Sequence, residues 1–321
     1  MILGVVILCL APVAALAGEP LRIESTIDAM GSTYTIVAYG EDRLRLESAV
    51  EESFEEVRRL DNLLSNYKPT SEWSRVNRDA AAGPVSVSLE LFGLLERCQR
   101  YSRISEGAFD ITVGPLVKLW GFYKGSGRLP HRAEIRTVMA RIGYGKVQLD
   151  GRNRTVRFLK EGVELDPGGI GKGYAVDRIV EILKNNGIKA ALVSAAGSTI
   201  YGLGAPPSQD GWRVKLRHPV KENEYVGEVT LKDLSMSTSG TSEKFFRAAG
   251  KIYSHIFDPR TGFPAQGMLS VSVTAPKALD SEAWAKPVFV NGRGWAQKNK
   301  PGNFRVFLCE DRLEIACAWL Q

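Results

Sequence analysis

The sequence predicts an α+β fold with mixed or antiparallel sheets flanked by helices. Helical and strand patterns are mixed along the 321 residues without the regular strand–helix–strand order of a doubly wound parallel sheet. From Trp212 onward the patterns are mostly strands separated by polar turns. No linker composition or internal repeat divides the chain, so residues 18–321 are expected to form a single domain.

Apolar periodicity gives the expected elements in order. The expected helices are residues 47–64, a segment capped by Ser88, residues 132–142, and residues 176–183 closed by Asn185-Asn186-Gly187. The expected strands are a pair within 22–39 that turns at Met30-Gly31, a hairpin of 147–149 with 156–158, and single strands at 190–195, 226–231, 253–257, 269–274 and 304–309.

The net charge and its distribution limit the classes of ligand that the protein is expected to bind. The formal net charge is +6 and is spread along the chain. No block of five or more Lys and Arg residues occurs, and aromatic residues do not alternate with basic ones. The composition therefore suits an anionic ligand or an acidic membrane face and gives little support for nucleic acid.

The first 17 residues, MILGVVILCLAPVAALA, carry no charge and end in an A-x-A pattern. The run is too short to span a bilayer, so it predicts an export signal cut after Ala17. No Lys or Arg precedes the run, which leaves two alternatives: the true start lies upstream, or the signal is weak. Cys9 does not predict a lipoprotein anchor, because bulky Leu8 stands where a small residue is needed.

After such a cleavage three cysteines remain, Cys98, Cys309 and Cys317. Their number is odd and they form no C-x-x-C pair. Neither a disulfide framework nor a zinc site is therefore expected.

A glycine-rich stretch, ELDPGGIGKGYAVD at 164–177, is the first candidate site. It is not a P-loop, because Asp166 and Gly173 stand where that motif needs Gly and Ser or Thr, and it lacks the third glycine of a dinucleotide fingerprint. Free N–H groups at the start of a helix near Gly173, with Lys172 beside them, would still face an anion. The alternative is a tight turn that needs glycine only for its backbone angles.

Further stretches occur together with the glycine-rich one. They are Met30-Gly31-Ser32, LSNYKPTSEWSRVN at 64–77, EGAFDITVGP at 106–115, STSG at 237–240 and HIFDPRTGFP at 255–264. In this order they resemble the ApbE family, the FAD:protein FMN transferases, from about Met30 to Gly292. HIFDPRTG and GAFDITVGP are specific to that family, whereas the glycine stretch alone is not.

The resemblance implies a two-lobed α+β fold with a flavin cleft between the lobes. It also implies a magnesium-dependent enzyme that cleaves FAD, transfers FMN to a threonine hydroxyl of an acceptor protein and releases AMP. Acceptors in the family include membrane subunits of electron-transfer complexes, which fits export to the periplasm or to the outer side of a membrane. Carried onto matching positions, the implied FAD contacts are Met30, Tyr67, Ala108, Phe109, Asp110, Asp166, Lys172 and His255, with the carbonyl of Gly169 near the metal.

The chemistry explains these residue types. A diphosphate needs counter-charge in an in-line displacement, which a cation and a lysine supply. The acceptor hydroxyl must lose a proton, so His255 and Asp258 are the candidate catalytic residues.

Each residue also has a purely structural alternative. Tyr67 and Phe109 could be packing aromatics, Asp110 could cap the backbone of Thr112, His255 could be a satisfied strand histidine, and Asp258 could pair with Arg260 in a turn.

The sequence departs from the family at the metal site. The family carries an aspartate and, four residues later, a threonine, both on magnesium; here these positions are Glu282 and Lys286. Glutamate can ligate a hard cation, but an ammonium group has no lone pair and repels one. A slip of two residues would place Asp280 and Trp284 there instead.

Three functions remain open from the sequence. The first is an active transferase in which Lys286 replaces part of the metal's charge, or whose metal lies on Glu282, Asp280 and backbone carbonyls. The second is an FAD-binding protein or FAD pyrophosphatase that has lost transfer. The third is a degenerate homologue kept as an interaction module.

Overall fold

The computed structural model describes residues 20–125, 127–248 and 250–321. Its centre is an eight-stranded sheet in the order β1-β2-β6-β7-β10-β15-β16-β17, in which every neighbouring pair is antiparallel. The strands are β1 Leu21–Ala29, β2 Ser32–Gly40, β6 Ala190–Ala195, β7 Thr199–Leu203, β10 Leu234–Gly240, β15 Met268–Ala275, β16 Arg305–Glu310 and β17 Ala316–Trp319. The predicted α+β class is confirmed.

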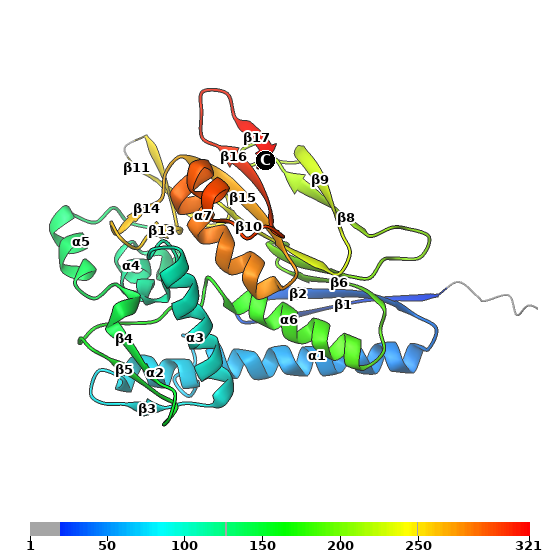
Figure 1. Ribbon diagram of the computed structural model, residues 1–321, viewed down its shortest axis with the longest axis horizontal. Helices are drawn as coiled ribbons and strands as arrows, with labels where there is room; N and C mark the ends of the chain where they lie inside the picture. The colour runs from blue at the N-terminus through cyan, green and yellow to red at the C-terminus, as the bar shows by residue number, and fades with distance from the viewer. Residues whose placement is uncertain (1–19, 126, 249) are drawn as a thin grey trace, which may run out of the picture.

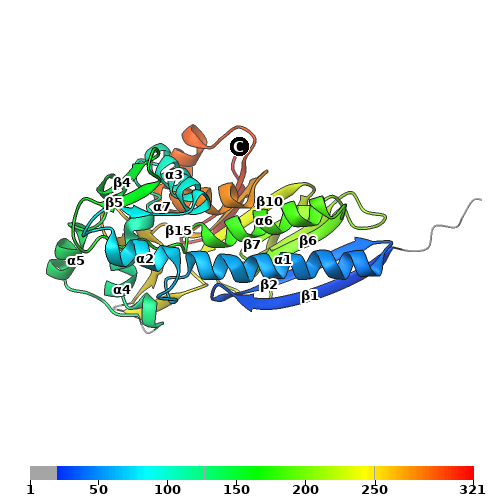
Figure 2. The same ribbon diagram turned by 90° about the horizontal axis from the view of Figure 1, so that it is seen from below.

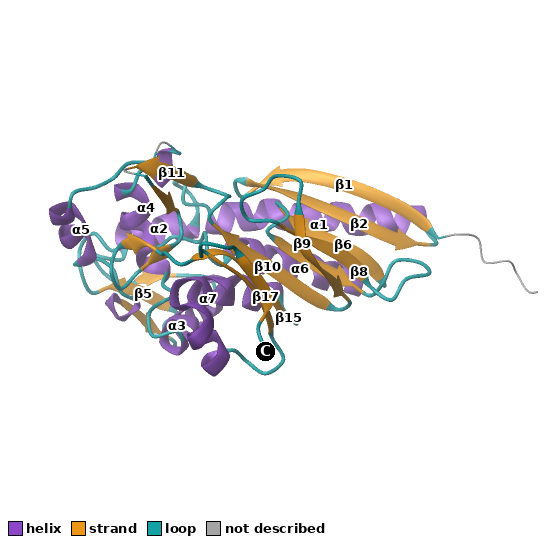
Figure 3. Ribbon diagram, turned by 90° about the horizontal axis from the view of Figure 1, so that it is seen from above, coloured by secondary structure: helices purple, strands orange, loops and turns teal. Residues whose placement is uncertain are grey.

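Three long helices cover one face of this sheet, and Figures 1 and 2 show α1 and α6 running side by side below it. They are α1 Arg43–Leu64, α6 Gly171–Asn185 and α7 Ala278–Asn299, the last interrupted at Gly292, where φ is 78°. A hairpin of β8 Trp212–Arg217 and β9 Tyr225–Leu231 packs its apolar side chains on the opposite face. Much of the sheet is therefore covered on both sides, whereas alternate side chains of the edge strand β1 are exposed. Figure 3 shows the strands in front of α1 and α6.

A second group of elements lies at one end of the sheet (Figure 1). Its helices are α2 Glu72–Asp79, α3 Leu89–Ile104, α4 Gly114–Leu119 and α5 Arg132–Met139. Its strands form one small sheet of β3 Val85–Ser86, β5 Thr155–Phe158 and β4 Val147–Asp150, and two short hairpins, β11 Phe245–Ala248 with β12 Lys251–Ser254 and β13 Phe257–Asp258 with β14 Phe263–Pro264. This group corresponds to the second lobe that the resemblance implied.

Most predicted elements are present, and the differences have local causes. The first helix begins earlier than residue 47 because the Asp42 carboxylate caps it, accepting from the Arg45 N–H at 3.2 Å. Ser88 caps α3 as predicted, through the Leu91 N–H at 3.3 Å. The strand predicted at 253–257 is instead broken at His255, because the chain changes its pairing partner there from β11 to β14.

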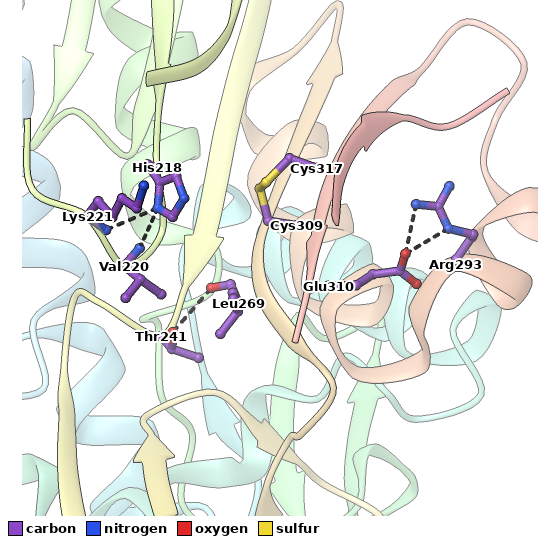
Figure 4. Close-up of a disulfide and its surroundings, with 9 residues drawn as sticks. All are labelled: His218, Val220, Lys221, Thr241, Leu269, Arg293, Cys309, Glu310 and Cys317. Carbon is purple, nitrogen blue, oxygen red and sulfur yellow. Dashed lines mark hydrogen bonds and ion pairs between the residues drawn. A yellow bond between two sulfur atoms is a disulfide. The ribbon is translucent and has the colours of Figure 1, made fainter. Parts of the chain in front are cut away.

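The absence of a disulfide framework was a wrong expectation. Cys309 on β16 and Cys317 on β17 are directly opposite in the strand register and form a disulfide (Figure 4). Their side chains meet because a hairpin that turns over residues 311–315 brings positions eight apart together. Arg293 of the preceding helix α7 pairs with Glu310 at 2.9 Å and fixes the end of β16 (Figure 4). Cys98 is free and buried in α3.

The predicted export signal at 1–17 lies outside the described residues. Within 20–125, 127–248 and 250–321, no helix is both long and apolar enough to cross a membrane.

Candidate functional site

The glycine-rich stretch links β5 to α6, and its start is fixed by side chains from α2. The Asn77 side-chain amide accepts from the Leu165 N–H at 2.7 Å and donates to the Leu165 carbonyl at 2.9 Å. The Trp73 indole N–H donates to the same carbonyl at 3.1 Å. Three hydrogen bonds thus hold both backbone polar groups of Leu165, which sets the path of the loop that follows.

Asp166 turns this loop. One carboxylate oxygen accepts from the Gly168 N–H at 2.8 Å and the other from the Asn66 amide at 3.3 Å. Burial raises the pKa of Asp166, against the effect of these bonds. In this structure its oxygens are used to shape the glycine loop.

Helix α6 begins at Gly171, inside the glycine stretch. The Gly171 N–H bonds to the Pro167 carbonyl at 2.9 Å, and the Gly173 N–H donates to Oε2 of Glu282 at 2.6 Å. The Gly171 N–H therefore does not face an anion, whereas the Gly173 N–H does, and that anion is the carboxylate of Glu282 within the chain. A Cβ on Gly173 would lie 2.4 Å from the Ala278 carbonyl oxygen, so glycine is required here because α7 passes very close.

Lys172 and Met30 lie beside the loop. The Lys172 ammonium donates to the hydroxyl of Ser198, in the turn between β6 and β7. The Met30 side chain reaches the loop, because its methyl carbon is 3.5 Å from where a Cβ of Gly171 would stand. Its sulfur accepts from the Tyr34 hydroxyl at 3.3 Å. Sequence reasoning missed Ser198, although a Gly-Ser turn between two strand patterns was a signal.

The three residues assigned to the metal position are brought together. Glu282 is 1% exposed, and its second oxygen, Oε1, is 3.9 Å from the Lys286 ammonium. The Lys286 Cε is 3.8 Å from the place of a Cβ on Gly169. Burial lowers the pKa of Lys286; Glu282 opposes that effect and the nearby Lys172 ammonium adds to it.

Phe109 packs against other side chains and Asp110 caps the backbone of Thr112, as the structural alternatives for these two residues predicted. Phe109 is buried, packs edge-on against Tyr101 at 5.6 Å, and lies 3.3 Å from where a Cβ of Gly169 would stand. Asp110 caps the following turn, accepting from the Thr112 N–H at 2.8 Å and the Tyr144 N–H at 2.6 Å. Ala108 is buried beside them. The Phe109 ring therefore packs against the glycine loop at Gly169.

Tyr67 is 69% exposed, which excludes the alternative of a core aromatic. Its ring stacks on Tyr123 with centroids 5.0 Å apart. The Lys118 ammonium lies 5.4 Å from the Tyr123 ring centroid and pairs with Glu164 at 2.5 Å. The exposed Tyr67 ring, stacked on the half-buried Tyr123 ring with a cation nearby, offers a flat surface to a planar ligand.

The two candidate catalytic residues differ. The His255 ring nitrogen Nδ1 is 3.2 Å from the Lys244 carbonyl, and burial lowers the pKa of the imidazole, with Lys286 among the charges that act on it. Asp258 is paired with Arg260 at 2.8 Å, and that guanidinium also reaches Asn291 at 2.7 Å. The carboxylate of Asp258 is thus occupied by the turn, whereas His255 lies within electrostatic reach of Lys286.

The residues present do not fit a magnesium ion. Oε2 of Glu282 already accepts the Gly173 N–H, and Lys286 offers a positive charge where a ligand is needed. The alternative ligand Asp280 accepts from the Tyr101 hydroxyl. Among the described residues no group of three or more His, Cys, Asp or Glu side chains could hold a metal ion.

Solved structures share this fold. The ApbE protein of Thermotoga maritima aligns with a TM-score of 0.83 at 29% identity and covers 92% of this chain and 96% of its own. The flavin transferase ApbE of Vibrio cholerae aligns with a TM-score of 0.82 at 25% identity over 94% and 96% of the two chains. The fold is therefore that of the flavin transferases.

The sequence comparisons agree. The model of the ApbE family matches residues 30–306. An FAD:protein FMN transferase of Klebsiella pneumoniae is 33% identical over 81% of this chain and 79% of its own, and one of Treponema pallidum is 33% identical over 77% and 72%. The chain belongs to the ApbE family. Because these relatives are transferases, it is a member of an enzyme family, as the resemblance implied.

Proposed function

We propose that this protein transfers FMN from FAD to a hydroxyl group of an acceptor protein and releases AMP. The observation that carries the proposal is the convergence of Lys172 and Lys286 at the glycine loop that begins α6, in a chain of the ApbE family. Two ammonium groups beside a helix N-terminus suit a ligand with adjacent phosphates. The stacked Tyr67–Tyr123 pair, in which Tyr67 is exposed, supplies a surface for a flat ring.

The reaction balances as one displacement at phosphorus. The acceptor oxygen forms a bond to the phosphorus of the FMN half, and the bond from that phosphorus to the bridging oxygen breaks. AMP leaves with the electron pair, and the hydroxyl proton goes to a base. Because burial lowers the pKa of His255, its imidazole is neutral near pH 7 and can accept that proton. Ammonium groups nearby stabilise the charge on the phosphate oxygens.

The finer parts of the proposal concern the acceptor and its location. We take the acceptor group to be a threonine hydroxyl, in a protein that is exported or exposed on the outer side of a membrane, such as a membrane subunit of an electron-transfer complex. The Cys309–Cys317 disulfide supports a location outside the cytoplasm, since such bonds persist in oxidising compartments. Magnesium, which the resemblance also implied, is not part of the proposed step, because the residues at its position do not fit it.

Mass spectrometry tests this function. The full chain is incubated with FAD and a set of peptides that each carry one threonine, beside matched peptides with valine in its place. We expect a mass gain equal to FMN on a threonine peptide, none on its valine partner, and AMP in equal amount. AMP and FMN released without any modified peptide would instead indicate an FAD pyrophosphatase.

A further inference from the structure

We propose that the Lys286 ammonium takes the place of a divalent cation at this site, so that the chain binds the FAD diphosphate without magnesium. The inference rests on the proposed function and specifies how its phosphate site is charged. Four observations on α6 and α7 carry it.

The first observation is a buried carboxylate of which one oxygen has no hydrogen-bond partner among the described residues. Glu282 is buried, and its Oε2 is satisfied by the Gly173 N–H. Its Oε1 has no hydrogen-bond partner among the described residues. A buried anionic oxygen without a partner is costly, so this position calls for a positive charge.

The second observation is that the chain itself supplies this charge. Lys286 stands one helical turn after Glu282 on α7, which places both side chains on the same helix face. Its ammonium is 3.9 Å from Oε1, close enough for an ion pair and too far for a hydrogen bond. A magnesium ion at Oε1 would lie against this ammonium and be repelled by it.

The third observation is that the ammonium still has hydrogen atoms to donate. No hydrogen bond from Lys286 Nζ is made to any part of the chain that the structure describes, although the side chain is only 23% exposed. An ammonium carries three N–H donors, and a partly buried one needs acceptors. A phosphate oxygen is an acceptor that also matches the charge of the ammonium, whereas a metal ion is not an acceptor.

The fourth observation is a second ammonium within electrostatic range. Lys172 stands at the start of α6 and is one of the charges that act on Lys286. The Glu282–Lys286 pair is neutral as a unit, and Lys172 adds a net positive charge beside the positive end of α6. Together the two lysines can contact both phosphates of a diphosphate, the task that a bridging cation performs elsewhere.

The test measures FAD binding to the full chain by quenching of flavin fluorescence, in excess chelator and in magnesium. We expect the same affinity in both buffers for the natural protein. Lys286→Thr should bind about 10- to 100-fold more weakly in chelator, as expected for loss of a hydrogen bond to a charged group. The matched control Lys298→Thr changes an exposed lysine on the same helix and should behave like the natural protein.

A second measurement records the binding of magnesium alone, without FAD, by titration calorimetry. The natural protein should show no saturable magnesium binding, and Lys286→Thr should gain it, because a hydroxyl ligand then stands beside Glu282. This readout does not depend on FAD and separates a lost site from a misfolded variant, whose thermal unfolding is recorded beside it.

Two outcomes would overturn the inference in distinguishable ways. FAD binding that appears only with magnesium would show that the ion, not Lys286, completes the site, while leaving the proposed function intact. No FAD binding in either buffer would remove the proposed function together with this inference.

Discussion

Asp177 shows how a single residue couples the two helices of the site. It lies on α6 and accepts hydrogen bonds from the first N–H groups of α7, those of Ala278 at 2.6 Å and Leu279 at 3.1 Å. Burial raises the pKa of Asp177 from 3.8 to about 6, although these bonds favour its charged form. The carboxylate thus positions the start of the helix that carries Glu282 and Lys286.

This pKa predicts a pH dependence of stability. Between pH 3.8 and about 6 the folded state binds a proton that the unfolded state has released, so stability falls as the pH rises through this window. The shift corresponds to about 3 kcal/mol at most. Urea unfolding of Asp177→Asn and the natural protein should show that the natural protein loses this stability relative to the variant on going from pH 4 to pH 6.5. A constant difference between the two proteins would contradict the raised pKa.

At Tyr67 the prediction concerns ligand binding. Because its ring is 69% exposed, Tyr67→Ala should leave the free energy of unfolding nearly unchanged. If the ring stacks on FAD, the variant should bind FAD more weakly by about 1–3 kcal/mol, the usual value for stacking on a base. Tyr67→Phe keeps the ring and should bind FAD normally. Equal FAD affinity in Tyr67→Ala would remove this residue from the site.

At the scale of elements, the close approach of α6 and α7 builds the site. Gly173 allows it, because any Cβ there would collide with backbone atoms of Ala278 and Leu279. The contact brings the Gly173 N–H to Glu282 and so fixes the side chain that pairs with Lys286. The same glycine therefore serves both packing and charge placement.

Two glycine substitutions test this packing. Gly173→Ala should destabilise the protein by about 1–3 kcal/mol or more, because backbone cannot yield as a side chain can. Gly93→Ala in α3 is the control: nothing lies within 4 Å of its added Cβ, and alanine should stabilise that helix by about 0.5–1 kcal/mol. Chemical unfolding of both variants gives the comparison. A stability for Gly173→Ala equal to that of the natural protein would mean that α7 can move away.

At the scale of the whole molecule, the last strands lie mostly beyond the family match. That match ends at residue 306, whereas the disulfide-linked hairpin extends from β16 to β17 at the edge of the large sheet. The disulfide holds β17 to the sheet edge through a hairpin whose turn carries exposed Leu313. The free energy of unfolding should therefore depend on whether the Cys309–Cys317 disulfide is oxidised or reduced.

Reduction provides the test. With dithiothreitol the natural protein should lose about 2–3 kcal/mol, the stabilisation expected for closing a short loop. The paired variant Cys309→Ala with Cys317→Ala should unfold at the same urea concentration with and without the reductant. An unfolding midpoint of the natural protein that does not respond to complete reduction would mean that strand pairing alone holds the hairpin.

The sequence by itself determined the α+β class, most helices and strands, and the stretches that identify the family. These features depend on neighbours within a few residues, through apolar period, capping residues such as Ser88, and turn glycines. The same local patterns placed Lys172 at the start of a helix and Glu282 four residues before Lys286 on one face. They could not show which partners these side chains meet.

Only the tertiary structure decided those partners, because they are distant in the chain. The Gly173 N–H and Glu282 are 109 residues apart, and Lys172 and Ser198 are 26 apart. For Asp110 and Asp258 the sequence had left a local pairing open as one alternative, and the structure shows that pairing. It also paired Cys309 with Cys317 across two strands. A buried polar group must find a partner wherever the fold brings one, and that choice is made by packing rather than by local sequence.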